Sequence, residues 1–458
     1  MTGLDTSSSR SYRALQTRQL DALLRDRAGL GEPERRRAQA VAAVFPFRTN
    51  GYVVDELIDW AAVPDDPVYR LTFPQPGMLS PPDAARIERL QADGAPAAAI
   101  QSAVREIRLR LNPHPAGQRD QNEPELAGQR LPGLQHKYAE TLLVFPRPGQ
   151  TCHAYCTYCF RWPQFVGDPE LKMATDGVAE LRAYLAAHPE VTNVLVTGGD
   201  ALIMSAAVLR RYVEPLLSVD TIEAVRLGTK ALSFWPYRLL TDPDADDLLA
   251  LFAQVVRSGR QLAVMAHFSH PRELATDAVR RALARIGSTG AVVRAQAPLI
   301  RGVNDDPVVW ERMWRELTRH SVVPYYMFVE RDTGPQGYFA VPLARGYEIF
   351  RDAYRRVSGL ARTVRGPVMS ATPGKVCVDG VAEVAGERVF VLRMLQARDP
   401  ELVGRPFFAG YDPAAIWLTD LKPALGQADL LPGLSPGGTR PGPLPGPSLR
   451  PSLGPSPG

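Results

Sequence analysis

Apolar runs alternate with amphipathic stretches through the middle of the chain. From residue 141 onward the apolar runs read TLLVFP, NVLVTG, AVRLGT, LAVMAHF, AVVRAQA and VVPYYMF. Because strands buried on both faces read as short continuous apolar runs, this alternation predicts six strand–helix units around a parallel sheet. Apolar residues at three- and four-residue spacing predict the helices at roughly 177–188, 205–218, 244–258, 273–287, 306–319 and 343–357.

Six consecutive units favour an α/β fold of the partial (βα)6 TIM-like barrel type, and an open doubly wound sheet is the alternative. Runs rich in alanine, leucine and arginine at 12–45 and 82–111 predict helices before the repeat. A valine-rich segment after it predicts a small hairpin that closes one end of the core, and a final segment rich in proline, glycine and serine predicts disorder. We therefore expect a mainly helical extension at 1–135, the barrel at 136–365, a C-terminal extension at 366–424 and a disordered tail at 425–458.

Composition narrows the class of protein. Of 458 residues, 45% are hydrophobic and 22% charged, which is typical of a soluble globular protein. The formal net charge of +4 is too small to favour nucleic acid or a membrane surface, so the expected partner is a small molecule. Four cysteines are too few for a disulfide scaffold, and neither a secretory leader nor a membrane-spanning apolar stretch is evident. We expect a reduced, cytoplasmic protein.

Three of the four cysteines stand together in Cys152-His-Ala-Tyr-Cys156-Thr-Tyr-Cys159, directly after the first predicted strand. Loops at the carboxyl ends of barrel strands assemble active sites. Three thiolates are one short of the usual four for a [4Fe–4S] cluster, which would leave one iron open to a small-molecule ligand. The alternative is zinc with His153 or Cys377 as fourth ligand, although zinc sites usually combine two closely spaced ligand pairs.

The cysteine spacing and several later motifs together resemble the radical S-adenosylmethionine superfamily and, within it, the lysine 2,3-aminomutase family. The resemblance covers roughly residues 130–376 and implies that the open iron binds S-adenosylmethionine and cleaves it to a 5′-deoxyadenosyl radical. It also implies hydrogen abstraction and a 1,2-amino migration on an amino acid. The motifs are Val196-Thr-Gly-Gly-Asp200, Arg226-Leu-Gly-Thr229, His267-Phe-Ser-His270-Pro, Leu299-Ile-Arg-Gly-Val-Asn304 and Pro324-Tyr-Tyr.

One motif, Thr197-Gly198-Gly199-Asp200, ends the second predicted strand. Two glycines let a ligand approach the backbone closely, and Asp200 can accept a hydrogen bond from an ammonium group. The resemblance implies that this segment contacts the amino group of S-adenosylmethionine and that His267 lies near the same ligand. A plain glycine turn and a structural histidine are the competing interpretations.

The resemblance also raises pyridoxal phosphate as a second cofactor, held as a Schiff base on a lysine after the last barrel strand. Only five lysines occur, and Lys375 in Pro373-Gly-Lys375 falls at that place. Lys137, Tyr138 and Gln296 match family positions around this cofactor. Other family positions are changed, because the lysine motif has one glycine instead of four and the residues Thr141, Tyr158 and Phe328 replace an arginine, a histidine and a tyrosine.

The positions that bind substrate in the family are also partly changed in this chain. Arg161, two residues after Cys159, matches an arginine that pairs with the substrate carboxylate, a role for which the guanidinium fork is suited. Arg331 falls where an aspartate binds the distal amine of lysine, and a cation there favours an anionic side chain such as that of glutamate. A shift of one residue would instead bring Glu330 or Asp332 to this place.

Two hypotheses therefore stay open. In the first, the chain is an amino acid 2,3-aminomutase with Lys375 and Arg161 as catalytic residues and Arg161 and Arg331 as substrate contacts. In the second, a radical S-adenosylmethionine enzyme without pyridoxal phosphate acts as an epimerase, a dehydrogenase or a tailoring enzyme. Both require an external electron donor of the flavodoxin or ferredoxin type, and the resemblance implies a homo-oligomer.

Overall fold

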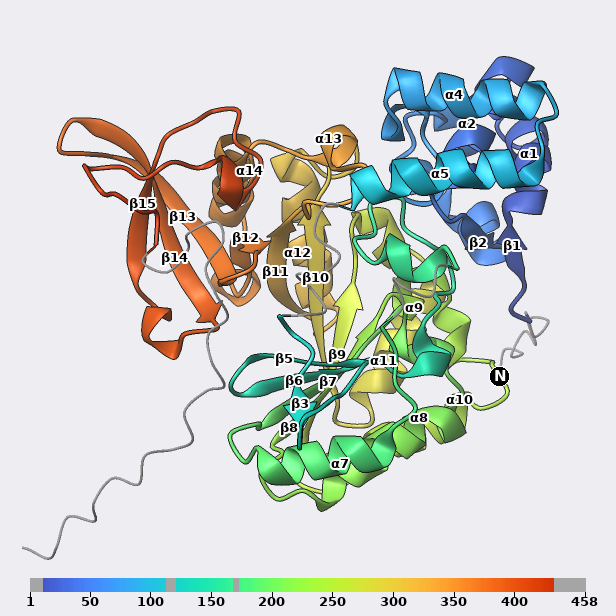
Figure 1. The fold of residues 1–458 in the computed structure, drawn as a ribbon. Coiled ribbons are helices and arrows are strands. Elements are labelled where there is room, and N and C mark those ends of the chain that lie inside the picture. The colour runs from blue at the N-terminus through green and yellow to red at the C-terminus, as the bar shows by residue number, and fades with distance from the viewer. Residues whose placement is uncertain (1–10, 113–120, 168–172, 432–458) are drawn as a thin grey trace, which may run out of the picture.

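The computed structural model describes residues 11–112, 121–167 and 173–431 and has a mixed α/β architecture (Figure 1). One large sheet of eleven strands runs in the order β15-β14-β13-β12-β11-β10-β9-β8-β7-β6-β5. All neighbours from β6 to β12 pair in parallel, and the other neighbours pair antiparallel. The central strands are β5 (Leu134–Tyr138), β6 (Thr141–Val144), β7 (Asn193–Val196), β8 (Ala224–Thr229), β9 (Gln261–His267), β10 (Val292–Leu299), β11 (Val323–Val329) and β12 (Arg365–Ser370).

The six predicted strands are confirmed as β6 to β11. Strand β12 adds a seventh parallel strand to the same sheet, within the segment expected to begin the C-terminal extension. Its sequence, RGPVMS, contains Gly366 and Pro367, which weaken a strand signal because glycine has no side chain to pack and proline cannot donate to the ladder.

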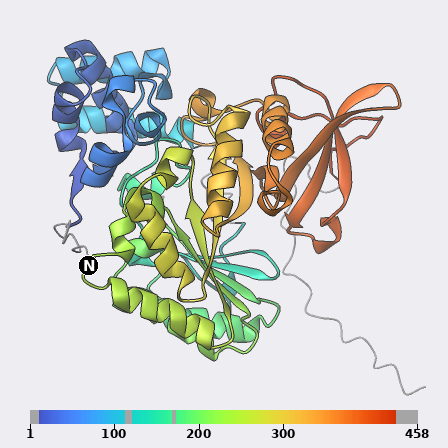
Figure 2. The same ribbon diagram turned by 180° about the vertical axis from the view of Figure 1, so that it is seen from behind.

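The predicted helices that follow the strands are confirmed. They lie over one face of the sheet, as the view from behind shows (Figure 2). In α10 the side chains of Leu248, Phe252 and Val255 are fully buried in the core shared with the strands. These helices are α7 (Val178–Ala187), α8 (Ala206–Val213), α10 (Ala245–Arg257), α11 (Asp277–Gly287), α12 (Pro307–Arg319) and α14 (Leu343–Arg355), with the short helices α9 (Ala231–Phe234) and α13 (Gln336–Phe339) between them.

The opposite face of the sheet carries polar side chains. Along β8 and β10 residues alternate between buried and half-buried, with Arg226, Arg294 and Gln296 on the half-buried face. Lys137 on β5, at one end of the sheet, donates to the carbonyl of Ala371, directly beyond β12, the last of the parallel strands. The first and last strands of the central part therefore approach each other across this polar face, which we call the inner face.

The N-terminal part is helical at 12–45 and 82–111, as predicted, apart from the short strand β1, which pairs antiparallel with β2. Its apolar side chains, among them Leu20 and Leu24, pack with Phe234 and Trp235 of the central part. The elements are β1 (Ala14–Gln16), α1 (Thr17–Asp26), α2 (Glu32–Val44), β2 (Arg48–Asn50), α3 (Pro67–Thr72), α4 (Pro81–Ala92) and α5 (Ala97–Leu111), followed by the hairpin β3 (Glu125–Leu126) and β4 (Gln129–Arg130).

The C-terminal strands β13 (Gly374–Val384) and β14 (Glu387–Ala397) form the predicted hairpin, and β15 (Pro406–Gly410) pairs with β14 at the edge of the sheet. The turn between β13 and β14 places Ala385 and Gly386 at positive φ. The prediction of a disordered tail from residue 425 is wrong for 425–431, where the amide of Leu425 donates to Glu387 and Leu431 is buried against this part. Residues 432–458 of that prediction lie outside the described residues.

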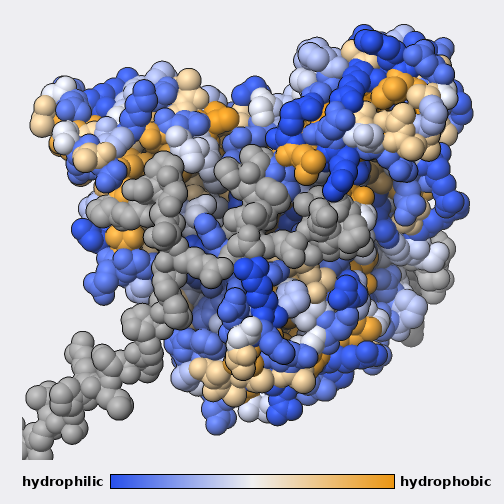
Figure 3. Space-filling model, viewed as in Figure 1, coloured by the Kyte–Doolittle hydropathy of each residue, from blue (hydrophilic) through white to orange (hydrophobic). Residues whose placement is uncertain are grey.

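Large apolar side chains that are exposed among the described residues stand on separate elements, at Leu109, Val308, Leu360 and Val403. The face shown in Figure 3 is correspondingly dominated by hydrophilic residues. None of the described helices is both long and apolar enough to cross a membrane.

Candidate active site

The cysteine loop follows β6 and is held from the other side by the N-terminal part of the chain. The Tyr12 hydroxyl and the Asn50 amide both donate to the carbonyl of His153, at 2.9 and 3.1 Å. The Thr157 hydroxyl donates to the carbonyl of Arg70 at 2.7 Å. Buried backbone carbonyls need such partners, so the N-terminal part fixes the conformation of the cysteine loop. Sequence reasoning gave that part no role at the site, because its contacts are made across more than 80 residues of chain.

The three cysteines are half-buried and unbridged. Burial raises the pKa of the Cys156 thiol to about 11 and that of Cys159 to about 12, and it raises the pKa of Cys152 well above its ordinary value. Free thiols here are therefore protonated at neutral pH, and the positive charge of bound iron is what would stabilise the thiolates.

The donor set of the cysteine loop is three thiols. Among the described residues, the one group of three ligand-type side chains with ligand atoms within 4.8 Å of one another is His136, His188 and Glu190, so the three cysteine sulfurs do not all lie within 4.8 Å of one another. Cys377, the alternative fourth ligand, is buried on β13 beside Tyr326. The donor set fits a [4Fe–4S] cluster with three protein ligands.

The Gly-Gly-Asp motif lies against the segment that leads into Cys152. A Cβ added at Gly199 would overlap the backbone of Thr151, and one added at Gly198 would overlap the side chain of Gln150. The Gly199 amide donates to the carbonyl of Gly149 at 2.9 Å. The two glycines thus leave room for the protein's own backbone at Gly149–Thr151, and not for a ligand as the sequence predicted. This contact positions the cysteine loop against the end of β7.

Asp200 is buried and already accepts three hydrogen bonds: from the amide of Leu202 at 2.8 Å, the hydroxyl of Thr229 at 2.7 Å and the amide of Lys230 at 2.8 Å. A carboxylate has about four acceptor positions, so one is left for a ligand. Asp200 therefore ties the ends of β7 and β8 together, and Thr197 immediately precedes this junction.

The variant Gly199→Ala tests this packing. Its methyl group would collide with backbone that cannot move without shifting Cys152, so we expect a loss of about 1–3 kcal/mol in the free energy of unfolding and lower iron content after anaerobic reconstitution. Thermal unfolding and iron analysis measure both. The control Gly287→Ala, where a Cβ meets nothing within 4 Å, should leave both unchanged. Wild-type melting and iron content in Gly199→Ala would contradict the assigned packing.

His267 and Gln296 lie side by side on β9 and β10, where the Gln296 amide donates to Nε2 of His267 at 2.8 Å. Burial, with the charges of Lys230 and Arg161 nearby, lowers the pKa of His267 to about 3. The imidazole is therefore neutral and acts as an acceptor. Lys230, which the sequence did not single out, forms a buried ion pair with Glu273 at 2.7 Å.

Lys137 and Lys375 meet at one ring. Their Nζ atoms lie 5.5 and 5.0 Å from the centroid of Tyr138. Burial and neighbouring cations lower the pKa of Lys137 to about 6 and that of Lys375 to about 7. The short motif still brings Lys375 into the site, because reciprocal backbone hydrogen bonds between Ala371 and Gly374 close a tight turn directly before it. A half-neutral buried amine is suited to nucleophilic attack on an aldehyde.

Arg161 and Arg331 converge on Phe160, each with its guanidinium carbon 5.1 Å from the ring centroid. Burial lowers the pKa of Arg161 to about 10, yet the group stays charged at neutral pH. Across the described ranges Arg161 forms no ion pair with a protein carboxylate. Burial raises the pKa of Glu330 well above its ordinary value, which favours the neutral form of this neighbour. Nε of Arg331 lies 3.9 Å from a carboxylate oxygen of Asp332, so of the two arginines Arg161 offers the less compensated positive charge to a ligand.

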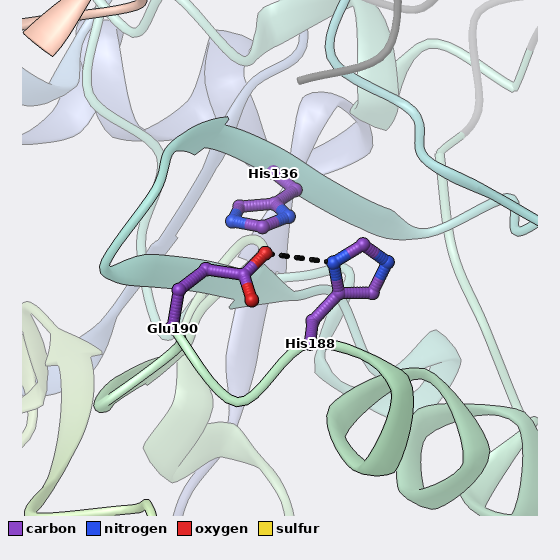
Figure 4. A group of neighbouring side chains, drawn as sticks. All are labelled: His136, His188 and Glu190. Atoms are coloured by element: carbon purple, nitrogen blue, oxygen red, sulfur yellow. Dashed lines mark hydrogen bonds and ion pairs between the residues drawn. The ribbon is translucent and has the colours of Figure 1, made fainter. Parts of the chain in front are cut away.

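A separate group of His136, His188 and Glu190 lies against α7 (Figure 4). The Tyr184 hydroxyl donates to Nδ1 of His136 at 2.7 Å, and Nε2 of His136 donates to the carbonyl of Ala139 at 3.0 Å. Both ring nitrogens of His136 are thus engaged. We interpret this group as structural.

No family model matches the chain. A putative L-lysine 2,3-aminomutase of Aquifex aeolicus is 32% identical over 389 residues, which cover 85% of this chain and 91% of the relative. A glutamate 2,3-aminomutase of Clostridioides difficile is 26% identical over 50% of this chain and 51% of its own length. Among solved structures, a radical SAM methyltransferase from Sphaerobacter thermophilus aligns at 18% identity, over 63% of this chain and 94% of that one, with a TM-score of 0.36, too low to establish a shared fold.

The long match and the three-cysteine loop define the class as radical S-adenosylmethionine enzymes. Within it, the chain belongs to the lysine 2,3-aminomutase family. It spans about half the length of several other curated relatives named L-lysine 2,3-aminomutase. The chain is an enzyme of the aminomutase kind, and its family implies a [4Fe–4S] cluster and S-adenosylmethionine.

Proposed function

We propose that this enzyme is a 2,3-aminomutase whose substrate is an α-amino acid with an anionic side chain, such as glutamate. The observation that carries the proposal is the convergence of Arg161 and Arg331 on Phe160 without a carboxylate that pairs with Arg161 in the described part of the chain. Two guanidinium groups suit two carboxylates and would repel the ammonium of a lysine side chain. The relative named glutamate 2,3-aminomutase supports this substrate class.

In this proposal the cluster and S-adenosylmethionine supply the radical that abstracts hydrogen, and pyridoxal phosphate supplies the aldehyde that carries the migrating nitrogen. Cys152, Cys156 and Cys159 hold the cluster. Arg161 orients the α-carboxylate and Arg331 the distal carboxylate. Lys375 presents a partly neutral amine, which fits the aldehyde, since its pKa is lowered to about 7.

Further parts of the proposal rest on the family and the sequence. The sheet with its outer helices acts as the partial (βα)6 barrel, within the four-part division of the chain given above. The enzyme works in the cytoplasm as a homo-oligomer. A flavodoxin- or ferredoxin-type protein reduces its cluster. Asp200 and His267 contribute to binding S-adenosylmethionine.

A second candidate is a radical S-adenosylmethionine enzyme without pyridoxal phosphate. Three changed positions favour it: Phe328 stacks on Tyr326 with ring centroids 4.8 Å apart, Tyr158 is bonded to Ser269 at 2.9 Å, and Thr141 is bonded to Glu140 at 3.3 Å. The first side chain has no polar group, and the other two hydroxyls are already engaged within the protein.

Release of 5′-deoxyadenosine against a panel of amino acids tests the substrate class. We expect glutamate to stimulate release and to yield the 3-amino isomer, and lysine to stimulate it at least tenfold less, because an unpaired buried charge costs several kcal/mol. Arg331→Gln should remove most of the preference for glutamate. A preference for lysine in the wild-type enzyme would contradict the proposed substrate. The same stimulation by glutamate without pyridoxal phosphate would favour the second candidate.

A further inference from the structure

Three arginines gather on the inner face, nearer the amino ends of the strands than the cysteine loop. Arg226 lies on β8, Arg294 on β10 and Arg365 at the start of β12. The guanidinium carbons of Arg294 and Arg365 lie 5.2 and 4.3 Å from the ring centroid of Tyr325. The guanidinium carbon of Arg365 also lies 4.3 Å from the centroid of Tyr326. Three strands thus bring three cations around two adjacent rings.

These cations lack compensation. In the described portion of the chain, none of the three forms an ion pair with a carboxylate, and Nε of Arg226 is buried without a hydrogen-bond partner. Burial and the charges of Arg294 and Arg365 lower the pKa of Arg226. Buried like charges destabilise one another unless an anion joins them. The three arginines are therefore suited to bind an anion that the described residues do not supply.

The site adjoins Lys375. Nζ of Lys375 lies 5.5 Å from the centroid of Tyr326, the ring on which Arg365 also packs. Arg226 and Arg365 are the cations that contribute most to lowering the pKa of Lys375. An anion held by these arginines would therefore be close to whatever is bound to the Lys375 amine.

We propose that Arg226, Arg294 and Arg365 form the phosphate subsite for pyridoxal phosphate bound at Lys375. This inference rests on the proposed function, which requires that cofactor. The aldehyde and the phosphate-bearing carbon of the cofactor stand on neighbouring ring positions, so an amine and an anion site that share one aromatic ring suit the two groups. Guanidinium groups bind phosphate bidentately and keep their charge when buried.

The proposed phosphate subsite explains why three family positions around the cofactor can be changed in this chain. Thr141, Tyr158 and Phe328 supply no cation, and Lys137, with a pKa near 6, is largely neutral before an anion binds. With the phosphate on the inner-face arginines, Arg161 and Arg331 are left to the substrate carboxylates. The inner-face arginines then supply positive charge for the phosphate, and Arg161 and Arg331 supply it for the substrate carboxylates.

The test is titration of the full chain with pyridoxal phosphate and, separately, with pyridoxal, which lacks the phosphate. Absorbance follows binding, and borohydride reduction with peptide mass spectrometry locates the adduct on Lys375. We expect Arg294→Gln and Arg365→Gln each to bind pyridoxal phosphate roughly tenfold to a hundredfold more weakly, because a charge-assisted hydrogen bond is lost. Pyridoxal binding should be unchanged, which also shows that the variants keep an intact site.

Inorganic phosphate should compete with pyridoxal phosphate in the wild type and much less in the two variants. The exposed control Arg257→Gln on α10 should behave like the wild type. Unchanged pyridoxal phosphate affinity in both arginine variants, or a comparable loss only in Lys137→Gln, would overturn the subsite and leave the proposed function standing. A wild type without an adduct on Lys375 would overturn both, and phosphate binding without an adduct would identify an anion site unconnected with that cofactor.

Discussion

Cys156→Ala is expected to abolish both iron–sulfur cluster assembly and cleavage of S-adenosylmethionine. With only two thiols left in the loop, the cluster loses a third of its protein ligands, and an incompletely ligated cluster is not retained. Anaerobic reconstitution should give iron and sulfide at background, no broad visible band near ~400 nm, and no 5′-deoxyadenosine after reduction. The expected fall in 5′-deoxyadenosine release is at least a thousandfold, since no side chain substitutes for the cluster as electron source.

Cys377→Ala provides the matched control. Cys377 is the fourth cysteine of the chain and is buried on β13, apart from the loop. Its replacement should leave iron content and 5′-deoxyadenosine release as in the wild type. Loss of metal in this variant would instead support the four-ligand zinc alternative, and full activity of Cys156→Ala would refute the cluster assignment.

Lys375→Ala is expected to eliminate the covalent adduct with pyridoxal phosphate and amino migration with it, while cluster assembly stays intact. The adduct is followed by absorbance and by mass spectrometry after borohydride reduction. Lys422→Ala, a lysine exposed outside the sheet core, is the control and should keep the adduct. Retention of the adduct in Lys375→Ala would assign it to another lysine, with Lys137 the neighbouring candidate.

The pH dependence of adduct formation supplies a second readout for Lys375. Burial has the largest effect and, with the charges of Arg226 and Arg365, lowers the pKa of Lys375 to about 7, while Glu140 raises it. The neutral amine is the reactive form, so the rate should rise from pH 6 and level off above about 7.5, with about a tenth of the amine neutral at pH 6. A rate that keeps rising tenfold per pH unit beyond pH 8 would indicate an ordinary, solvated lysine.

Much of the site could be predicted because its groups follow the ends of predicted strands. The cysteine loop follows β6, the Gly-Gly-Asp motif follows β7, His267 ends β9 and Arg331 comes two residues after β11. Parallel strands bring their carboxyl ends to one edge of a sheet, so residues that follow successive strands in the sequence lie close together in the structure.

Other features depend on partners that are remote in sequence. The role of Gly199 became apparent only when the structure placed Thr151 against it. Strand β12 was not predicted because Gly366 and Pro367 weaken its strand signal. Its place in the sheet is set by the pairing of Arg365 and Val368 with β11. The contribution of the N-terminal part rests on hydrogen bonds such as that from Asn50 on β2 to the carbonyl of His153.

Local patterns in the sequence were enough to predict the order of strands and helices, the three thiols of the cysteine loop and the family, because periodicity and motif spacing are local properties of a chain. Only the tertiary structure decided that Lys137 and Lys375 share the ring of Tyr138, and that Arg226, Arg294 and Arg365 lie together without carboxylate partners among the described residues. The physical reason is that strand register selects which side chains meet on the inner face. Burial then sets their charge, since desolvation depends on every neighbour at once.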